Sequence, residues 1–464
     1  MNKLPLSRRL ILYCLFSSMA GLLFGFDTGV ISGALAFIQR QYQLSSLALE
    51  CTVSAVPITA AVGAICSGFL SDHYGRRATL MLAAIAFMLG ALLSSLANSI
   101  TDLILSRFIV GLAIGVSSYL APLYIAEIAP KRYRGALVAC NTIMITGGIV
   151  VSYVTDYAFS GLTYNWRWMF AVGLIPATLF LLGLLFLPES PRFLAQKQLL
   201  SQAVNILKSI RPGADIQAEM AEISKTISLN QNNTLRSIWT QPRYLFLLLI
   251  GISLAILQQV TGINAILYYC PTLLHAMGIS GSQSQLAGSI GVGTINFIMT
   301  IIAMLLVDKV GRRTLLLLGF AMMTLSLLLF GTLLSVPHSS ANNLILVISL
   351  ILFMISYAIS IGCVFWIVIA EIYPLAIRSR CMCIAASANW LSNWFVSMTF
   401  LSLGHRFGFG SCFIIYAALC GLGFVVIYYF LPETKKLSLE QLENKLKQLR
   451  IKSNLIIENK ITYK

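Results

Sequence analysis

The sequence predicts an all-α polytopic membrane protein, and its composition and apolar stretches support this fold class. The chain of 464 residues is 58% hydrophobic and only 10% charged, whereas soluble domains carry about 25% charged residues. Crossing a bilayer core takes about 20 apolar residues, and twelve stretches of the chain meet that length. The predicted spans are residues 10–37, 47–70, 78–97, 103–126, 136–158, 167–187, 244–276, 284–307, 314–336, 344–370, 381–403 and 410–431.

The positions of Lys and Arg orient these spans. With the N-terminus in the cytoplasm, 28 of the 32 Lys and Arg residues fall in cytoplasmic segments, as the positive-inside rule requires. Both termini are therefore predicted to be cytoplasmic. Because topology accounts for the net charge of +16, we expect a lipid bilayer as the partner and no nucleic acid. The short loops favour a bacterial inner (plasma) membrane.

Three motifs occur twice in the same order, which indicates two tandem halves. The pairs are "DHYGRR" (72–77) with "DKVGRR" (308–313), "EIAPKRYR" (127–134) with "EIYPLAIR" (371–378), and, loosely, "PESPR" (188–192) with "PETKK" (432–436). Parallel repeats of this kind place a substrate site near the membrane midplane, between the halves. The predicted domains are an N-terminal six-helix bundle at 1–187, a cytoplasmic linker with short surface helices at 188–243, a C-terminal six-helix bundle at 244–431 and a cytoplasmic tail at 432–464.

The repeated motifs place carboxylates and arginines together at the cytoplasmic helix ends. Asp72 and Asp308 lie at C-terminal helix ends, where the helix dipole disfavours an anion unless it is paired. Charge clusters that break and reform suit a cytoplasmic gate; charges that merely fix topology would explain the arginines but not the matched carboxylates. The predicted gate residues are Asp72, Arg76, Arg77, Glu127, Arg134, Glu189, Arg192, Asp308, Arg312, Arg313, Glu371 and Arg378.

The first span, "GLLFGFDTGVISGAL" (21–35), holds a single charge, Asp27. Glycines recur in it every four residues and form a stripe on which another helix can pack closely. At about 100° per residue, Asp27 points away from this stripe. Lipid is a costly environment for a carboxylate, so we expect Asp27 to face a polar cavity.

The fourth span supplies a partner for Asp27. Arg107 shares a helix face with Gly111 and Gly115, which leave room for a neighbouring helix beside the guanidinium. A carboxylate that gains and loses an arginine partner can release and take up a proton. The alternative is a static ion pair that fastens two helices together.

The seventh span carries three amides, Gln258, Gln259 and Asn264. On an unbroken helix, Asn264 would lie about 120–140° from either glutamine, but Gly262 permits a local break that turns all three into one cavity. Amides both donate and accept hydrogen bonds, which suits a neutral solute rich in hydroxyl groups; such groups can instead join helices to each other. Further amides in later spans are Asn296, Asn389 and Asn393.

These motifs, with "QQVTGINAILYY" (258–269), resemble the sugar porter family of the major facilitator superfamily over essentially residues 10–440. The segment "GFDTGVISGAL" is similar in particular to bacterial proton-coupled porters for xylose, arabinose, galactose or inositol. The resemblance implies the major facilitator fold, with 12 transmembrane helices in two pseudo-symmetric six-helix bundles. It also implies that Asp27 and Arg107 interact to couple transport to protons.

The resemblance assigns aromatic side chains to the sugar cavity as well. Trp366 and Trp390 match tryptophans of the family's cavity, and Phe24, Tyr268 and Tyr269 are further candidates for contact with a sugar ring. For the tyrosines, ordinary packing is an equal alternative.

Two positions depart from the family pattern. Thr142 stands in the fifth span, where most members carry a binding glutamine, and Cys363 replaces the proline that usually follows Gly362. Because proline kinks a helix, we expect Cys363 to stiffen the hinge at Gly362. Both departures bear on which substrate is bound.

The sequence therefore predicts a proton-coupled symporter that imports a monosaccharide or polyol by alternating access. An uncoupled sugar facilitator of the same fold is the alternative, and an exporter or a non-transporting sugar sensor is less expected. No nucleophile–base pair or cofactor motif indicates an enzyme, and the scattered cysteines indicate no metal site. The proton would be the coupling ion, with no cofactor, and the protein is expected to be a monomer.

Overall fold

The computed structural model describes residues 7–130, 133–210, 216–218, 220–221, 223–224, 239, 241–336, 340–374, 377–433 and 435, and the regular elements in these segments are helices. The first helices are α1 (Arg8–Tyr42), α2 (Ser46–Tyr74), α3 (Arg76–Leu96), α4 (Ile100–Ile128), α5 (Arg134–Phe159), α6 (Asn165–Val172), α7 (Leu174–Phe186), α8 (Pro191–Gln196) and α9 (Leu200–Ile210). The later ones are α12 (Pro242–Val260), α13 (Ile263–Tyr268), α14 (Cys270–Ala276), α15 (Ser282–Val310), α16 (Arg312–Leu334), α17 (Ser340–Tyr357), the π-helical turn η1 (Ala358–Gly362), α18 (Cys363–Ile372), α19 (Arg378–Phe407) and α20 (Phe409–Phe430).

Twelve long helical segments account for the twelve predicted spans. Eleven of them, within the described residues, are long and apolar enough to cross a membrane. Three of these eleven are interrupted: α6 continues into α7, α12 into α13, and α17 through η1 into α18. The twelfth, α19, has 30 residues, and its Ser, Asn and Arg side chains make it more polar than the others.

The outer surfaces of these helices are apolar. Large hydrophobic side chains are exposed on most of them, including Phe69, Leu89, Leu182, Leu305, Leu325 and Phe395. Polar and charged side chains such as Asp27, Glu50 and Gln258 are buried instead. This inversion of the soluble pattern is what a lipid environment demands.

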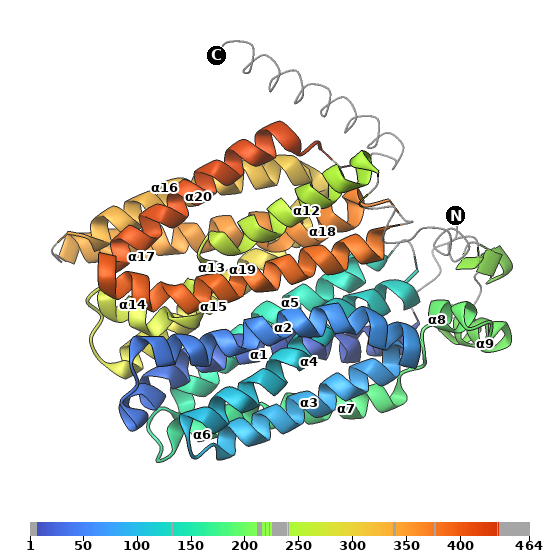
Figure 1. Ribbon diagram of the computed structural model, residues 1–464, viewed down its shortest axis with the longest axis horizontal. Helices are drawn as coiled ribbons and strands as arrows, with labels where there is room; N and C mark the ends of the chain where they lie inside the picture. The colour runs from blue at the N-terminus through green and yellow to red at the C-terminus, as the bar shows by residue number, and fades with distance from the viewer. Residues whose placement is uncertain are drawn as a thin grey trace, which may run out of the picture.

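The helices form two groups. Figure 1 shows α1–α7 together in blue and cyan and α12–α20 together in green to red. Within the first group α1 packs on α5 and α2 on α4; within the second, α16 packs on α20. The contact of α2 with α19 and of α5 with α15 joins the two groups.

The two ends of the molecule differ in charge. We call the end that carries Arg76 and Arg312 the basic end, and the other the opposite end. The short helices α8 and α9 lie beyond the helix ends at the basic end (Figure 1). Both lie within the predicted linker, 188–243, while most of residues 211–240 and the tail from 436 onward lie outside the described residues.

The glycine stripe of α1 packs on α5. A Cβ atom at Gly25 would lie 1.8 Å from the Ile145 carbonyl oxygen, and one at Gly29 would lie 1.7 Å from Ser152 Oγ. Only glycine permits this approach. The stripe therefore fixes the rotation of α1, and with it the direction in which Asp27 points.

Candidate functional site

Asp27 and Arg107 form a bidentate ion pair between α1 and α4. Arg107 Nη1 donates to Asp27 Oδ1 at 2.9 Å, and Nη2 donates to Oδ2 at 3.1 Å. The guanidinium also lies 5.8 Å from the centroid of the Phe170 ring. Asp27 is 8% exposed and Arg107 1%. In such an environment the two charges stabilise each other, and either alone is costly.

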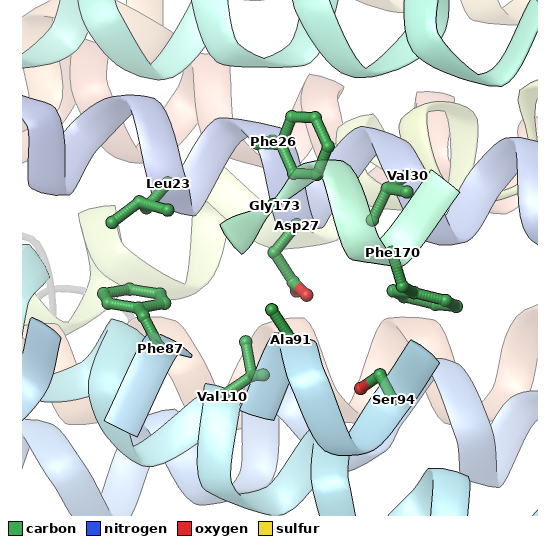
Figure 2. Close-up of a pocket in the computed structure, with 10 residues that line it drawn as sticks. All are labelled: Leu23, Phe26, Asp27, Val30, Phe87, Ala91, Ser94, Val110, Phe170 and Gly173. Atoms are coloured by element: carbon green, nitrogen blue, oxygen red, sulfur yellow. The ribbon is translucent and has the colours of Figure 1, made fainter. Parts of the chain in front are cut away.

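The Asp27 side chain faces the inside of the first helix group. Figure 2 shows its carboxyl directed into a small cavity between Phe87, Val110 and Phe170. The cavity is also lined by Ser94 of α3 and by Gly173, where α6 meets α7. The predicted direction away from the glycine stripe is thus observed, and this cavity belongs to α1, α3, α4 and α6.

The amides of α12, α13 and α19 form one hydrogen-bonded chain. Asn264 Nδ2 donates to Gln259 Oε1 at 2.5 Å, and Gln259 Nε2 donates to Asn389 Oδ1 at 3.0 Å. Asn389 Nδ2 in turn donates to Gln258 Oε1 at 2.6 Å. Three of the four side chains are buried and that of Asn264 is half-buried. The structure therefore brings together the seventh-span amides and the first asparagine of the eleventh.

The break that permits this lies where the sequence predicts it. Helix α12 ends at Val260, Gly262 has a φ of 84°, and α13 begins at Ile263. A Cβ at Gly262 would lie 2.4 Å from Tyr416 Cδ2. Both the left-handed backbone and the close approach of the ring require glycine.

Phe24 and Trp390 meet across the two helix groups. Their ring centroids are 5.2 Å apart, with Phe24 on α1 and Trp390 on α19. Trp390 Nε1 is buried and has no hydrogen-bond partner among the described residues. A buried donor without a partner is costly, and a hydroxyl of a bound solute would satisfy it.

Tyr268 connects the amide region with the ion pair. Asn393 Nδ2 donates to the Tyr268 hydroxyl at 3.2 Å, and the same hydroxyl lies within electrostatic reach of Asp27 and Arg107. Tyr269 instead stacks on Phe400 at 5.3 Å and donates to the Ser397 carbonyl at 2.9 Å, as packing would predict.

Two predicted binding residues stand apart from the amide chain. Asn296 is buried on α15, and Trp366 is half-buried on α18 against Phe365, with ring centroids 4.8 Å apart. Within the described residues, no hydrogen bond of the amide chain reaches Asn296 or Trp366.

The helix is interrupted near Gly362, although the absence of a proline predicted a stiffer helix there. We expected Cys363 to stiffen it, but the helix is interrupted by the π-helical turn of η1, with Ser360 at φ −107° and ψ −109°. The Ser360 side chain fills the space beside Gly319 of α16, and its hydroxyl donates to the Ser356 carbonyl at 2.5 Å. Packing against α16 therefore maintains the break without a proline.

The charged residues at the basic end of the first group are tied together as predicted. Arg76 contacts Asp72 at 3.2 Å and Glu127 at 3.2 Å. Glu189 accepts the backbone N–H of Arg76 at 2.9 Å and that of Arg77 at 3.2 Å. Burial raises the pKa of the Glu189 carboxyl above its ordinary value, and these N–H donors act against that rise.

The second group repeats this arrangement. Arg312 contacts Asp308 at 2.9 Å and Glu371 at 3.0 Å. Glu433 accepts the backbone N–H of Arg312 at 3.0 Å and that of Arg313 at 3.1 Å. Glu433 was not among the predicted gate residues, although the pairing of "PETKK" with "PESPR" offered the signal.

The remaining gate arginines approach each other across the two groups. Arg378 of α19 lies within electrostatic reach of Arg134 and Arg192, and its Nε donates to the Tyr373 carbonyl at 3.0 Å. The ion pairs of Arg76 and of Arg312 each join residues of one group. The predicted clusters are therefore present in each half, and their role as a gate stays a prediction.

Hydrogen bonds cross between the groups at the opposite end, which the sequence analysis missed. Glu50 of α2 accepts the backbone N–H of Ser402 at 2.7 Å and also its hydroxyl. The Tyr153 hydroxyl of α5 donates to the Leu267 carbonyl of α13 at 2.8 Å. The available signal for Glu50 was an acid inside the predicted span 47–70.

Two bundles of membrane-spanning helices with a buried, hydrogen-bonding interior define the class of membrane transporters rather than enzymes. The chain belongs to the sugar transporter family: the family model described as "Sugar (and other) transporter" matches residues 13–446. It is 39% identical over 437 residues to the galactose-proton symporter of Escherichia coli, covering 93% of each chain.

Other proteins similar to this chain are also sugar transporters. The D-xylose transporter of Levilactobacillus brevis is 39% identical over 438 residues, covering 93% of this chain and 94% of that one. The structure is similar to that of the major facilitator superfamily proton:xylose symporter XylE of Escherichia coli, bound to 6-bromo-6-deoxy-D-glucose, with a TM-score of 0.82 and 31% identity over 94% of this chain and 99% of XylE.

Proposed function

We propose that this protein imports a monosaccharide together with a proton by alternating access, in the inner membrane of a bacterium. The relatives include symporters of galactose, arabinose and xylose with protons. The basic end is assigned to the cytoplasm by the positive-inside rule. The two six-helix bundles move relative to each other about the central site.

The observation that carries the proposal is the buried Asp27–Arg107 pair, whose helix α1 directly contacts α13, the helix that carries Asn264 of the amide set. The amides supply neutral hydrogen bonding suited to sugar hydroxyls. The ion pair supplies a carboxylate that binds a proton when its arginine withdraws. Tyr268, which contacts Asn393, lies between the two parts.

Assigned roles follow from this arrangement. Gln258, Gln259, Asn264 and Asn389 bind the sugar, and the unpartnered Nε1 of Trp390 donates to one of its hydroxyl groups. Phe24 stacks on the apolar face of the ring beside Trp390. The matched clusters around Arg76 and Arg312 act as cytoplasmic gates, one in each half.

The proposal is tested with purified protein in proteoliposomes. Radiolabelled galactose, xylose, arabinose, glucose and inositol are each offered with and without an imposed pH gradient, inside alkaline. We expect one or more monosaccharides to accumulate only with the gradient. Equilibration without accumulation would make the protein a facilitator, and no uptake of any sugar would refute the proposal.

A further inference from the structure

Asp156 is a buried carboxyl group that the proposed mechanism does not use. It lies on α5, one turn before the end of that helix at Phe159, and is 0% exposed. No side chain among the described residues donates a hydrogen bond to either of its carboxyl oxygens, and the backbone N–H of Gly33 is a weak donor beside it. This is unusual among the buried acids of the described residues, because Asp27, Glu50 and Glu127 each accept a hydrogen bond from a donor in the protein.

The carboxyl fits a space left by a glycine. A Cβ atom at Gly33 of α1 would lie 2.3 Å from Asp156 Oδ2. The neighbouring Ser32 hydroxyl is also buried and lies beside the Tyr153 hydroxyl. Gly33, the last glycine of the stripe, thus makes room for the acid between α1 and α5.

Among the described residues, no cation pairs with Asp156 to offset a negative charge. The titratable or charged groups on the helices around this part of α5 are Tyr153 and Tyr157 on α5 itself, Asp27, Arg40 and Tyr42 on α1, Arg107 on α4, Arg167 on α6, Tyr268 on α13 and Cys270 on α14. The charged residues of α15, Asp308 and Lys309, lie at its other end. Arg107 is paired with Asp27 and Arg40 is exposed. Arg167 donates to the Ala97 carbonyl at 2.8 Å. An ionised carboxylate buried without a partner costs far more than the neutral acid, so Asp156 carries a proton in this conformation.

Asp156 lies beside a contact that must break when the opposite end opens. Tyr153, one helical turn away on α5, donates its hydroxyl to the Leu267 carbonyl of α13 in the other helix group. Separation of the groups at this end breaks that bond and admits water to the end of α5. Hydration then favours the ionised carboxylate, and reclosing requires the proton to return.

We propose that Asp156 is a second proton-binding residue, whose protonation is needed for the Tyr153–Leu267 contact to close. This inference rests on the proposed function, because alternating access is what opens the contact. The proton returns to the side it came from, so Asp156 adds nothing to the proton count per sugar. It makes closure of the opposite end depend on the pH of the solution on that side.

The test uses Asp156→Asn, which keeps the shape of the neutral acid but cannot ionise. It is made in the Asp27→Asn background, where proton coupling is expected to be absent, and sugar counterflow is followed as external pH rises. In the Asp27→Asn protein, the rate of counterflow should fall at alkaline pH, by up to about tenfold per pH unit. In the protein with both Asp27→Asn and Asp156→Asn, the rate should show no such decline. A decline that persists in the double variant would overturn the inference.

Ser152→Ala in the same background is the matched control, because Ser152 lies one turn before Asp156 and packs on Gly29. It should retain the alkaline decline. If it also removes the decline, then helix packing rather than a proton explains the effect, and the inference is wrong.

Infrared spectroscopy tests the protonation of Asp156 independently of transport. The Asp27→Asn protein, labelled with ¹³C-aspartate, should show an isotope-shifted band of a protonated carboxyl group at neutral pH. Absence of that band overturns the inference even if Asp156→Asn fails to insert. Absence of counterflow for every sugar, with the band present, would instead refute the proposed function.

Discussion

The two terminal NH2 groups of Arg107 donate hydrogen bonds to the two carboxylate oxygens of Asp27, and this contact lies within the first helix group rather than at the boundary between the groups. The glycine stripe holds α1 against α5 and so directs Asp27 toward α4. Loss of the charge on Asp27 leaves the Arg107 guanidinium buried without its anion, which is costly unless the arginine moves to another environment. Proton binding to Asp27 therefore requires movement of the guanidinium.

Replacing Asp27 with Asn should abolish accumulation of sugar against a gradient. The amide cannot bind and release a proton, so the ratio of internal to external sugar should stay at about 1 under an imposed pH gradient. Counterflow should continue, because it needs only the movement of the bundles. Asp102→Asn, an acid in the first turn of α4, is the control and should accumulate sugar normally. Full accumulation by Asp27→Asn would rule out its coupling role.

Replacing Asn389 with Ala should weaken sugar binding. Asn389 donates to Gln258 at 2.6 Å and accepts from Gln259 at 3.0 Å, so its loss leaves two glutamines without their partner. We expect the KM for uptake to rise at least about tenfold, which corresponds to roughly 1.4 kcal/mol. Ser392→Ala, on the next turn, should have little effect because its hydroxyl bonds only to its own helix. An unchanged KM in Asn389→Ala would place the site elsewhere.

Replacing Gly262 with Ala should damage the break between α12 and α13. The position has a φ of 84° and a Cβ there would lie 2.4 Å from the Tyr416 ring. We expect the free energy of unfolding to fall by more than about 1 kcal/mol, measured as thermal unfolding in detergent, together with a higher KM. Gly135→Ala, with no heavy atom within 4 Å of the added Cβ, should do neither. Equal behaviour of the two variants would contradict a role for the break.

Glu189 predicts a pH dependence of stability at the basic end. Burial raises the pKa of its carboxyl above the ordinary value of 4.5, so the folded protein holds the proton more tightly than the unfolded chain. The stabilising contribution is complete below pH 4.5 and is lost as pH rises through the folded-state value. Over that range the melting temperature of the native protein should fall relative to Glu189→Gln, which stays neutral. Parallel melting curves for the two proteins would refute this assignment.

The sequence was informative where a short-range pattern determines the structure. The four-residue spacing of glycines in α1 predicts close helix packing, and α5 provides it. Gly262 predicts the break after α12, and the duplicated motifs predict the matched clusters around Arg76 and Arg312. Each of these follows from local backbone freedom or from repetition.

The sequence was less informative where the surroundings come from distant helices. A helical wheel gives the direction of Asp27 relative to the glycines, but not that Phe87 and Val110 stand opposite it. We expected Asp27 to face a polar cavity, and it faces instead a small cavity inside the first helix group that is lined mostly by apolar side chains. The interruption at Ser360 likewise depends on Gly319 of α16, which no local pattern in α17 reveals.

The separation of the ion pair from the amide chain has an evolutionary consequence. The carboxylate and guanidinium belong to α1 and α4, whereas the amide chain belongs to α12, α13 and α19. Under the roles proposed above, substitutions in the second set can alter which solute is carried while the energy source stays intact. Substrate specificity can then change through residues of α12, α13 and α19, while proton coupling is retained by residues of α1 and α4.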